Sequence, residues 1–144
     1  LVVRHNVSTN TTFTSYGDVI LTKVSVALRA NSSNQVDNAT GLPRPVTVSL
    51  AQAGLYESGS FVPTTNLFAL KDQILVYDNS KTNKNKSSAG TYYYYNSGWR
   101  KSGSATSIDF GTSNVFTPGA GFIIRKAAGG SSGSWANSAT YTNQ

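Results

Sequence analysis

Four consecutive tyrosines, Tyr92–Tyr95, constrain the fold of this chain more than any other feature, because a turn sequence follows them directly. Tyrosine is enriched in β-strands. Asn96–Gly98 consists of residues that form tight turns, and Trp99–Lys101 then continues with strand-forming character. The stretch therefore predicts two antiparallel strands joined by a short turn. Side chains alternate along a strand, so the even-numbered tyrosines should face one side of the sheet and the odd-numbered ones the other.

Apolar and polar residues alternate in several other stretches, as expected for half-buried strands. Val19–Leu28 and Val46–Leu50 show this alternation, and Ile74–Tyr77 and Phe122–Lys126 are further predicted strands. Ile74–Tyr77 is apolar throughout, which indicates a central strand covered on both faces. Leu1–Val3 and Thr12–Tyr16 are weaker strand candidates. Turn-forming residues cluster between these elements, at Asn31–Asn34, Asn38–Gly41, Asp78–Gly90, Pro118–Gly121 and Gly129–Gly133.

Helical patterns are scarce in the sequence. Ser49–Tyr56 and Thr65–Gln73 could each hold one short helical turn, the second with Leu67, Phe68 and Leu70 pointing inward. Short strands separated by turns predict an all-β protein. We expect residues 1–144 to form a single β-sandwich or barrel-like domain of about seven or more strands, with at most one or two short helical turns.

Composition narrows the partners that the chain can have. Charged residues make up 12% of the sequence, about half the usual share. The net charge is +6, but the basic residues are scattered, and the densest group (Lys81, Lys84 and Lys86) falls in a polar loop. Nucleic-acid sites normally concentrate such charge on one face, so we expect no nucleic-acid partner. No apolar run approaches the roughly 20 residues of a transmembrane helix.

No set of residues with catalytic spacing stands out. Gly129–Gly133 matches the G-x-S-x-G pattern formally, but it lies in a Gly/Ser tract without a following helix, so it reads as a linker. His5 is the single histidine, and the chain has no cysteine. The acidic residues Asp18, Asp37, Glu57, Asp72, Asp78 and Asp109 are dispersed. We expect no enzyme activity, no cofactor and no metal site, with calcium at the Asp78 loop a minor alternative.

One lysine raises a question of covalent chemistry. Exported β-proteins sometimes link a lysine to an asparagine inside the core, a reaction that needs a buried lysine beside a carboxylate. Lys23 is the candidate for such a link, and alternation within Val19–Leu28 places it on the side facing water. We therefore expect an ordinary surface lysine at this position.

Several short stretches, in order, resemble a known group of proteins. The stretches are Leu42–Val46, Ala53–Gly59, Asp72–Asn79, Asn85–Ser87, Tyr92–Arg100, Phe116–Lys126 and Trp135–Ser138. Together they resemble the C-terminal part of an uncharacterised family of secreted bacterial proteins of the Verrucomicrobia type. The resemblance implies export and a β-rich fold, and it carries over no catalytic or binding residue.

Two sets of residues are candidates for surface functions. Asn-X-Ser/Thr sequons, which mark surface loops if exported proteins are glycosylated in the host, begin at Asn6, Asn10, Asn31, Asn38 and Asn85. The aromatic residues that could contact a neighbouring subunit or a glycan are Tyr92, Tyr93, Tyr94, Tyr95, Trp99, Trp135 and Tyr141. Alternation should send one tyrosine pair of the strand into the core and leave the other pair for such contacts.

The low-charge surface and the lack of a catalytic set favour a secreted structural protein that assembles with copies of itself into a filament, pilus-like fibre or surface layer. The N-terminal segment, with apolar Leu1, Val2, Val3 and Val7, could join a neighbour's sheet as an added strand. Pairing of that segment within its own sheet is an equally open alternative. A different function is a monomeric secreted module that binds glycans or cell-surface polymers through exposed aromatic residues.

Overall fold

The computed structural model describes residues 23–42, 44–78, 80 and 87–137, and these residues form seven β-strands. The strands are β1 (Val24–Leu28), β2 (Val36–Gly41), β3 (Gln73–Val76), β4 (Gly90–Tyr95), β5 (Gly98–Lys101), β6 (Gly121–Lys126) and β7 (Gly133–Asn137). The protein is all-β and sandwich-like: the described part of the chain contains no helix, and so none that could cross a membrane.

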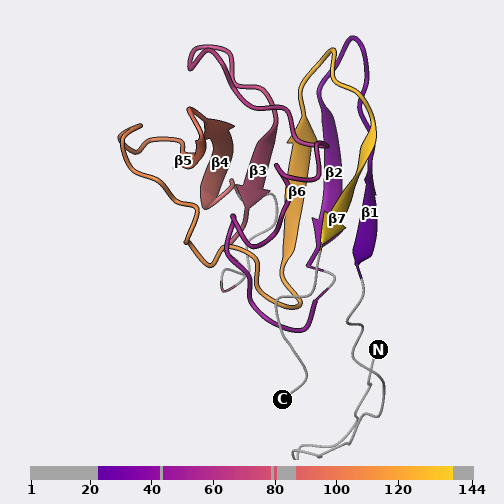
Figure 1. Ribbon diagram of the computed structural model, residues 1–144, viewed down its shortest axis with the longest axis vertical. Coiled ribbons are helices and arrows are strands. Elements are labelled where there is room, and N and C mark those ends of the chain that lie inside the picture. Colours follow the sequence, from indigo (N-terminus) through magenta and orange to yellow (C-terminus); the bar gives the residue numbers. More distant parts are fainter. Residues whose placement is uncertain (1–22, 43, 79, 81–86, 138–144) are drawn as a thin grey trace, which may run out of the picture.

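The strands form two antiparallel sheets of unequal size (Figure 1). The larger sheet has the order β2-β6-β3-β4-β5, and the smaller sheet consists of β1 and β7. Figure 1 shows the smaller sheet at the β2 end of the larger one. Over the other strands, the second layer is formed by residues 48–61, which we call the covering segment. One layer of the sandwich is thus only partly a sheet.

A single bent ribbon connects the two layers. Val24 pairs with Asn137 and Leu28 with Gly133 in the β1–β7 ladder, and the β2–β6 ladder resumes with Val36 opposite Lys126. Between the ladders, the seven residues 29–35 oppose the six residues 127–132. Both stretches lie outside the ladders, and through them the same two chain segments pass from one layer to the other.

The predicted hairpin of Tyr92–Tyr95 and Trp99–Lys101 is confirmed. Its strands β4 and β5 pair with Tyr94 opposite Trp99. Asn96 and Ser97 both have positive φ, 47° and 56°, which is the pattern of a two-residue type I′ turn. The predicted central strand is also confirmed, because β3 lies in the middle of the larger sheet.

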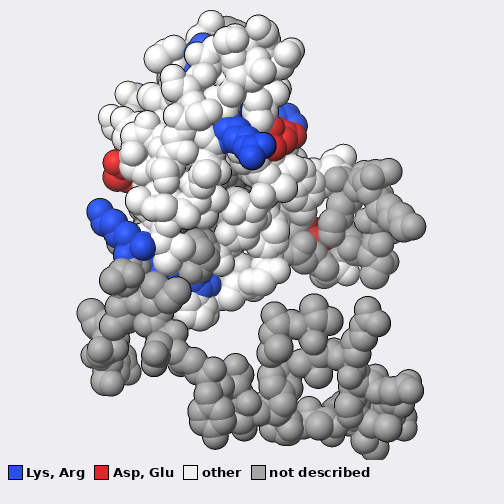
Figure 2. All heavy atoms as spheres, turned by 90° about the vertical axis from the view of Figure 1, so that its right-hand side faces the viewer, with Lys and Arg blue, Asp and Glu red and all other residues white. Residues whose placement is uncertain are grey.

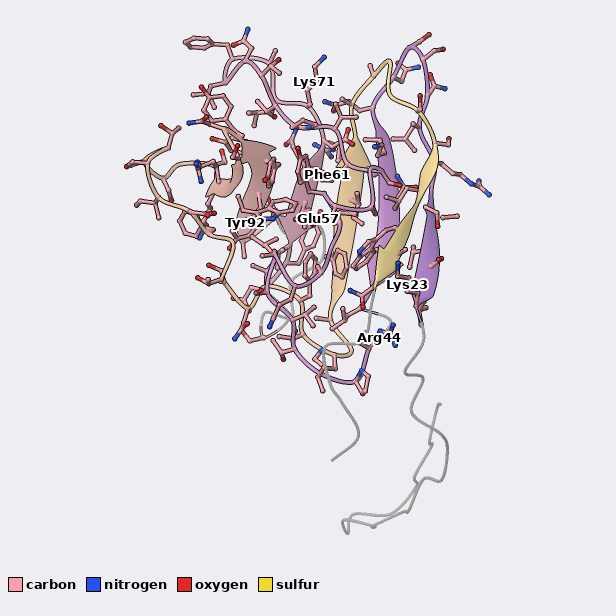
Figure 3. All side chains as sticks on the ribbon, viewed as in Figure 1. Lys23, Arg44, Glu57, Phe61, Lys71 and Tyr92 are labelled. Atoms are coloured by element: carbon pink, nitrogen blue, oxygen red, sulfur yellow. The ribbon has the colours of Figure 1, made fainter. Side chains whose placement is uncertain are left out.

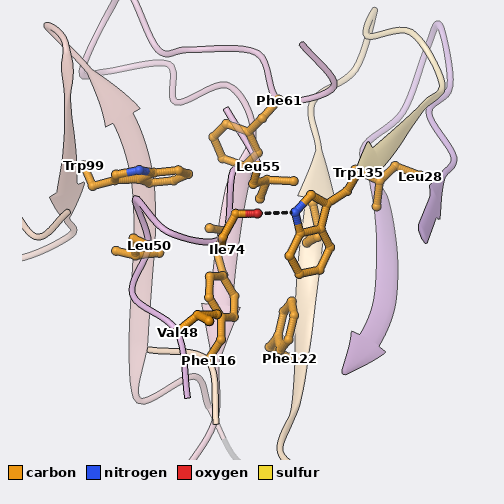
Figure 4. Close-up of a cluster of buried hydrophobic side chains, with 12 residues drawn as sticks. Leu28, Val48, Leu50, Leu55, Phe61, Ile74, Trp99, Phe116, Phe122 and Trp135 are labelled. Atoms are coloured by element: carbon orange, nitrogen blue, oxygen red, sulfur yellow. Dashed lines mark hydrogen bonds between the residues drawn. The ribbon is translucent and has the colours of Figure 1, made fainter. Parts of the chain in front are cut away.

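The core lies between the larger sheet, the smaller sheet and the covering segment (Figure 4). Its largest fully buried side chains include Trp99, Trp135 and Phe116. Phe116 lies 4.6 Å from Phe122 and 5.9 Å from Trp135, measured between ring centroids. The indole N–H of Trp135 donates a 2.7 Å hydrogen bond to the carbonyl of Ala53, so this aromatic cluster also fixes the covering segment.

The prediction of a strand at Val46–Leu50 is wrong. Only one bridge forms there, between Val48 and Phe116, and Val46 is partly exposed. The chain instead enters a series of turns after Ser49, whose side chain caps the backbone N–H of Gln52 while the Gln52 side chain accepts from the Ser49 N–H. This reciprocal capping starts a helix-like turn, as predicted for Ser49–Tyr56, and it ends the extended backbone.

The predicted helical turn at Thr65–Gln73 points its apolar side chains in the wrong direction. Asn66 accepts a 2.9 Å hydrogen bond from the N–H of Phe68, as a cap would. However, Phe68 is fully exposed and Leu67 is 39% exposed, although the sequence pattern predicts that both point inward. The Thr64 hydroxyl accepts from the N–H of Lys71 across the segment, which closes it as a loop that carries the apolar side chains outward.

Candidate functional site: an open strand edge and a buried charge pair

Two strands on the same side of the sandwich have open edges. Within the described ranges, β1 pairs only with β7 and β2 only with β6, and both lie at the right of Figure 1. An unpaired edge presents a row of backbone N–H and C=O groups that another strand can pair with. The edges of β1 and β2 are therefore the candidate interface of this protein.

The other two edges are covered by the chain itself. Beside β5, the N–H of Phe110 donates to the carbonyl of Trp99, and the Trp99 N–H donates to the Asp109 carboxylate, both at 2.9 Å. Beside β7, the hydroxyl of Ser60 donates to the carbonyl of Ser134 at 2.7 Å and accepts from its N–H at 3.0 Å. Among the described residues, edge protection is thus selective: it covers β5 and β7 but not β1 or β2.

The side of the molecule that carries the open edges has few charges. Figure 2 shows mostly uncharged residues on this face, with isolated basic and acidic groups. Asp37 and Arg125 form a bidentate ion pair across β2 and β6, with N–O distances of 2.7 and 2.8 Å. Hydrogen bonding from Arg125 lowers the pKa of Asp37 and raises that of the arginine, so this pair carries no net charge at neutral pH.

The sequon at Asn38 does not lie in a surface loop. Asn38 belongs to β2, and its side-chain amide donates to the carbonyls of Arg29 (2.9 Å) and Ile124 (3.2 Å). A glycan on this nitrogen would disrupt both bonds. Asn31 is exposed in the β1–β2 loop, as a sequon residue should be. Asn6, Asn10 and Asn85 lie outside the described residues.

Most of the candidate contact aromatics are part of the interior. Trp99, Trp135 and Tyr93 are 2%, 0% and 5% exposed, so they cannot form a contact surface. Tyr92 and Tyr94 pack against the core, and burial raises the pKa of both hydroxyls. Tyr93 faces the other side of the sheet but is the most buried of the four tyrosines, so the predicted split into one inner and one outer pair is wrong. Tyr94 also stacks on Tyr56 with ring centroids 3.7 Å apart. Tyr95 is half-buried, and Tyr141 lies outside the described residues.

A lysine and an aspartate form an ion pair inside the protein. The side chains of Lys126 and Asp72 are 1% and 0% exposed, and the Lys126 ammonium contacts Oδ2 of Asp72 and the carbonyl of Ser60. Two backbone N–H groups complete the site: Ala127 donates to Oδ1 and Val62 to Oδ2, each at 2.8 Å. Every polar group at this site therefore has a partner, as buried charges require.

The pair lies at one end of two neighbouring strands, where β3 begins and β6 ends. Ladder pairing of Gln73 with Arg125, continued by one residue, sets Asp72 opposite Lys126. Alternation along Phe122–Lys126 predicts an inward Lys126, because Phe122 and Ile124 are buried on the same side. Lys23, the lysine that the sequence offers as a candidate for such a pair, is exposed as expected. The same alternation rule that places Lys23 on the outside, applied to β6, identifies Lys126 as the inward-facing lysine.

The other candidate features form no site among the described residues. A small open cavity of about 210 Å³ is lined by Lys23, Gln52, Gly54, Glu57, Ser58 and Ala136. Figure 3 shows Lys23 near the start of β1 and Glu57 on the covering segment.

Among the residues with defined positions, no three His, Asp or Glu side chains come together as metal ligands. Asp78 accepts from the Ser80 N–H and hydroxyl, as in an ordinary turn. His5, Leu1, Val2, Val3 and Val7 lie outside the described residues.

Comparison of the chain with models of known protein families, with curated proteins and with solved structures finds no match.

Proposed function

We propose that this protein is an extracellular structural subunit that assembles with copies of itself by adding a neighbour's strand to the open edge of β1. The observation that carries this proposal is the incomplete second layer. Within the described residues only two strands form that layer, and β7 is capped by the covering segment while β1 is not. A strand added at β1 would extend the smaller sheet and satisfy its free backbone groups.

The surface around the edge supports this proposal. Natural edge strands are commonly protected by charged residues or proline. The exposed positions of β1 are Ser25 and Ala27, and neither residue gives such protection. The fully exposed Phe68 offers an additional apolar contact on another part of the molecule.

The incoming strand is proposed to be the N-terminal segment of the next copy. Leu1, Val2, Val3 and Val7 would supply the side chains that set its register. Secretion to the cell exterior is part of the same proposal. It is supported by the resemblance to exported proteins and by a surface whose solubility depends on hydroxyl and amide groups. The glycan-binding alternative needs an exposed aromatic row, and the described aromatic side chains offer none.

Deletion of residues 1–8 tests the strand donor. The shortened chain should remain monomeric in light scattering at concentrations at which the full chain assembles. Addition of a peptide with the sequence of residues 1–8 should then cap the free edge of the shortened chain. Assembly of the shortened chain to the same size as the full chain would exclude donation by this segment. Replacement of the three valines by threonine keeps the length and serves as the matched control for loss of apolar side chains.

A further inference from the structure

The buried pair of Lys126 and Asp72 has the arrangement of reactants for an amide bond. The amine and the carboxyl group contact each other, and the surrounding protein excludes water from both. Two reactants that the protein holds in contact react as if one of them were present at a very high effective concentration. Condensation releases water, and hydrolysis of the product consumes it, so a dry site favours the amide and protects it.

Condensation needs both groups in their uncharged forms. Two opposite charges in the interior both lose their hydration. Transfer of one proton from the Lys126 ammonium to the Asp72 carboxylate removes both charges at once. The products of this transfer are a neutral amine and a carboxylic acid, which are the nucleophile and the electrophile that condensation needs.

The backbone around Asp72 is suited to stabilise the reaction. The N–H of Ala127 donates to Oδ1, on which negative charge develops when the amine attacks the carboxyl carbon. The N–H of Val62 donates to Oδ2, the oxygen that would leave. The carbonyl of Ser60 accepts a hydrogen bond from Nζ of Lys126 and thereby fixes the direction of the amine.

We propose that Lys126 and Asp72 form an intramolecular amide cross-link in the folded protein. Nζ of the neutral amine attacks Cγ of the protonated carboxyl group, so the Cγ–Nζ bond forms. The Cγ–Oδ2 bond then breaks, and Oδ2 leaves as water with the carboxyl proton and one amine proton. No oxidant or further reactant is needed. In the product, the amide N–H keeps the Ser60 carbonyl as acceptor, and the amide oxygen keeps the Ala127 N–H.

The cross-link would join two central strands of the larger sheet. Asp72 directly precedes β3 and Lys126 ends β6, so the amide would close a covalent loop around residues 72–126. Such a loop resists separation of β3 from β6 under force, which suits a protein exposed outside the cell. This chemistry is independent of self-assembly, since all its groups belong to one copy.

Intact mass of the denatured full-length chain tests the cross-link. The wild-type protein should be lighter than its sequence by the mass of one water molecule. Lys126→Arg keeps the positive charge but removes the nucleophilic amine, so this variant should have the full mass. Lys71→Arg is the matched control and should keep the deficit, because Lys71 is exposed and points away from the sheets in Figure 3.

Tryptic peptide mapping then locates the bond. The peptide that contains Asp72 should appear joined to the peptide that contains Lys126, with no cleavage after Lys126. A wild-type chain of full mass would overturn the proposal and leave an ion pair only. A deficit that persists in the Lys126→Arg variant would also overturn it, because the water would then be lost elsewhere. Both measurements are made on denatured chains, so a folding defect in a variant cannot account for a positive result in the wild type.

Discussion

Asn38 in β2 and Arg29, which directly follows β1, are joined by two hydrogen bonds that link the layers of the sandwich. The Asn38 side-chain oxygen accepts from the Arg29 N–H at 2.7 Å, and its amide donates to the Arg29 carbonyl at 2.9 Å. The same amide donates to the carbonyl of Ile124 in β6. One side chain thus holds the ribbon corner at which the chain passes between the sheets.

Replacement of Asn38 by alanine should destabilise the protein. The change leaves three backbone groups without their partner, and we expect a loss of about 1–3 kcal/mol in the free energy of unfolding. Urea denaturation followed by tryptophan fluorescence measures this value. Asn114→Ala is the control, since Asn114 is exposed in a loop and should change stability little. Equal effects of the two substitutions would refute the role assigned to Asn38.

The glycine at position 98 makes room for a buried arginine. A Cβ atom at this position would lie 2.5 Å from Nη1 of Arg100, whose guanidinium folds back over the turn and donates to the carbonyl of Asn96. We expect Gly98→Ala to cost roughly 1–3 kcal/mol, as overpacking does. In a double-mutant cycle with Arg100→Ala, the two effects should be clearly less than additive. Additive effects would show that no steric conflict exists between these residues.

The two tryptophans should respond differently to replacement by phenylalanine. Trp135 donates its indole N–H to Ala53, whereas the buried indole N–H of Trp99 has no hydrogen-bond partner among the described residues. Trp99→Phe removes an unsatisfied donor, and Trp135→Phe removes a bond worth about 1 kcal/mol. Trp135→Phe should therefore be the more destabilising change in thermal unfolding. The reverse order would contradict this assignment of hydrogen bonds.

Acid should weaken the contact between β2 and β6. The pKa of Asp37 is lowered by the hydrogen bond from Arg125, so its stabilising effect is present above its unfolded-state pKa. That effect is lost as the pH falls through the lowered, folded-state pKa. Asp37 and Arg125 are partly exposed, and such a pair contributes about 1 kcal/mol or less.

An NMR titration of the Asp37 carboxyl group checks this prediction. The midpoint should lie below the usual value of about 3.9 and return toward it in Arg125→Gln. Identical midpoints in the two proteins would show that Arg125 does not affect the ionisation of Asp37.

Strands with strong alternation or turn chemistry can be predicted from the sequence. The β4–β5 hairpin is one example, since its tyrosines and its Asn-Ser turn agree on the same structure. Within β2, by contrast, Asn38, Thr40 and Gly41 favour a turn locally, so the sequence predicts a turn where a strand forms. In the structure, pairing with β6 and the hydrogen bonds of Asn38 override that local preference.

The candidate site is harder to predict because it depends on contacts between distant segments. Nothing local to β7 indicates that Ser60 covers its edge, and nothing local to β1 indicates that its edge is open. The position of Phe68 is equally hard to predict. Its apolar character predicts burial, but the loop closed by Thr64 and Lys71 turns it outward. Lys126 is within reach of the alternation rule, but its partner Asp72 lies 54 residues away in the chain, and only the pairing of β3 with β6 brings the two together.

Self-assembly through the β1 edge is tested most directly by light scattering of the full-length protein over a range of concentrations. The wild type should grow into oligomers or fibres as the concentration rises. A variant with Ser25→Lys and Ala27→Lys should stay monomeric, because two charges beside the edge oppose strand addition. A control variant with Thr106→Lys and Ser107→Lys adds the same charge on an exposed loop and should still assemble. A wild-type protein that stays monomeric at every concentration, or an edge variant that assembles as well as the control, would contradict the account.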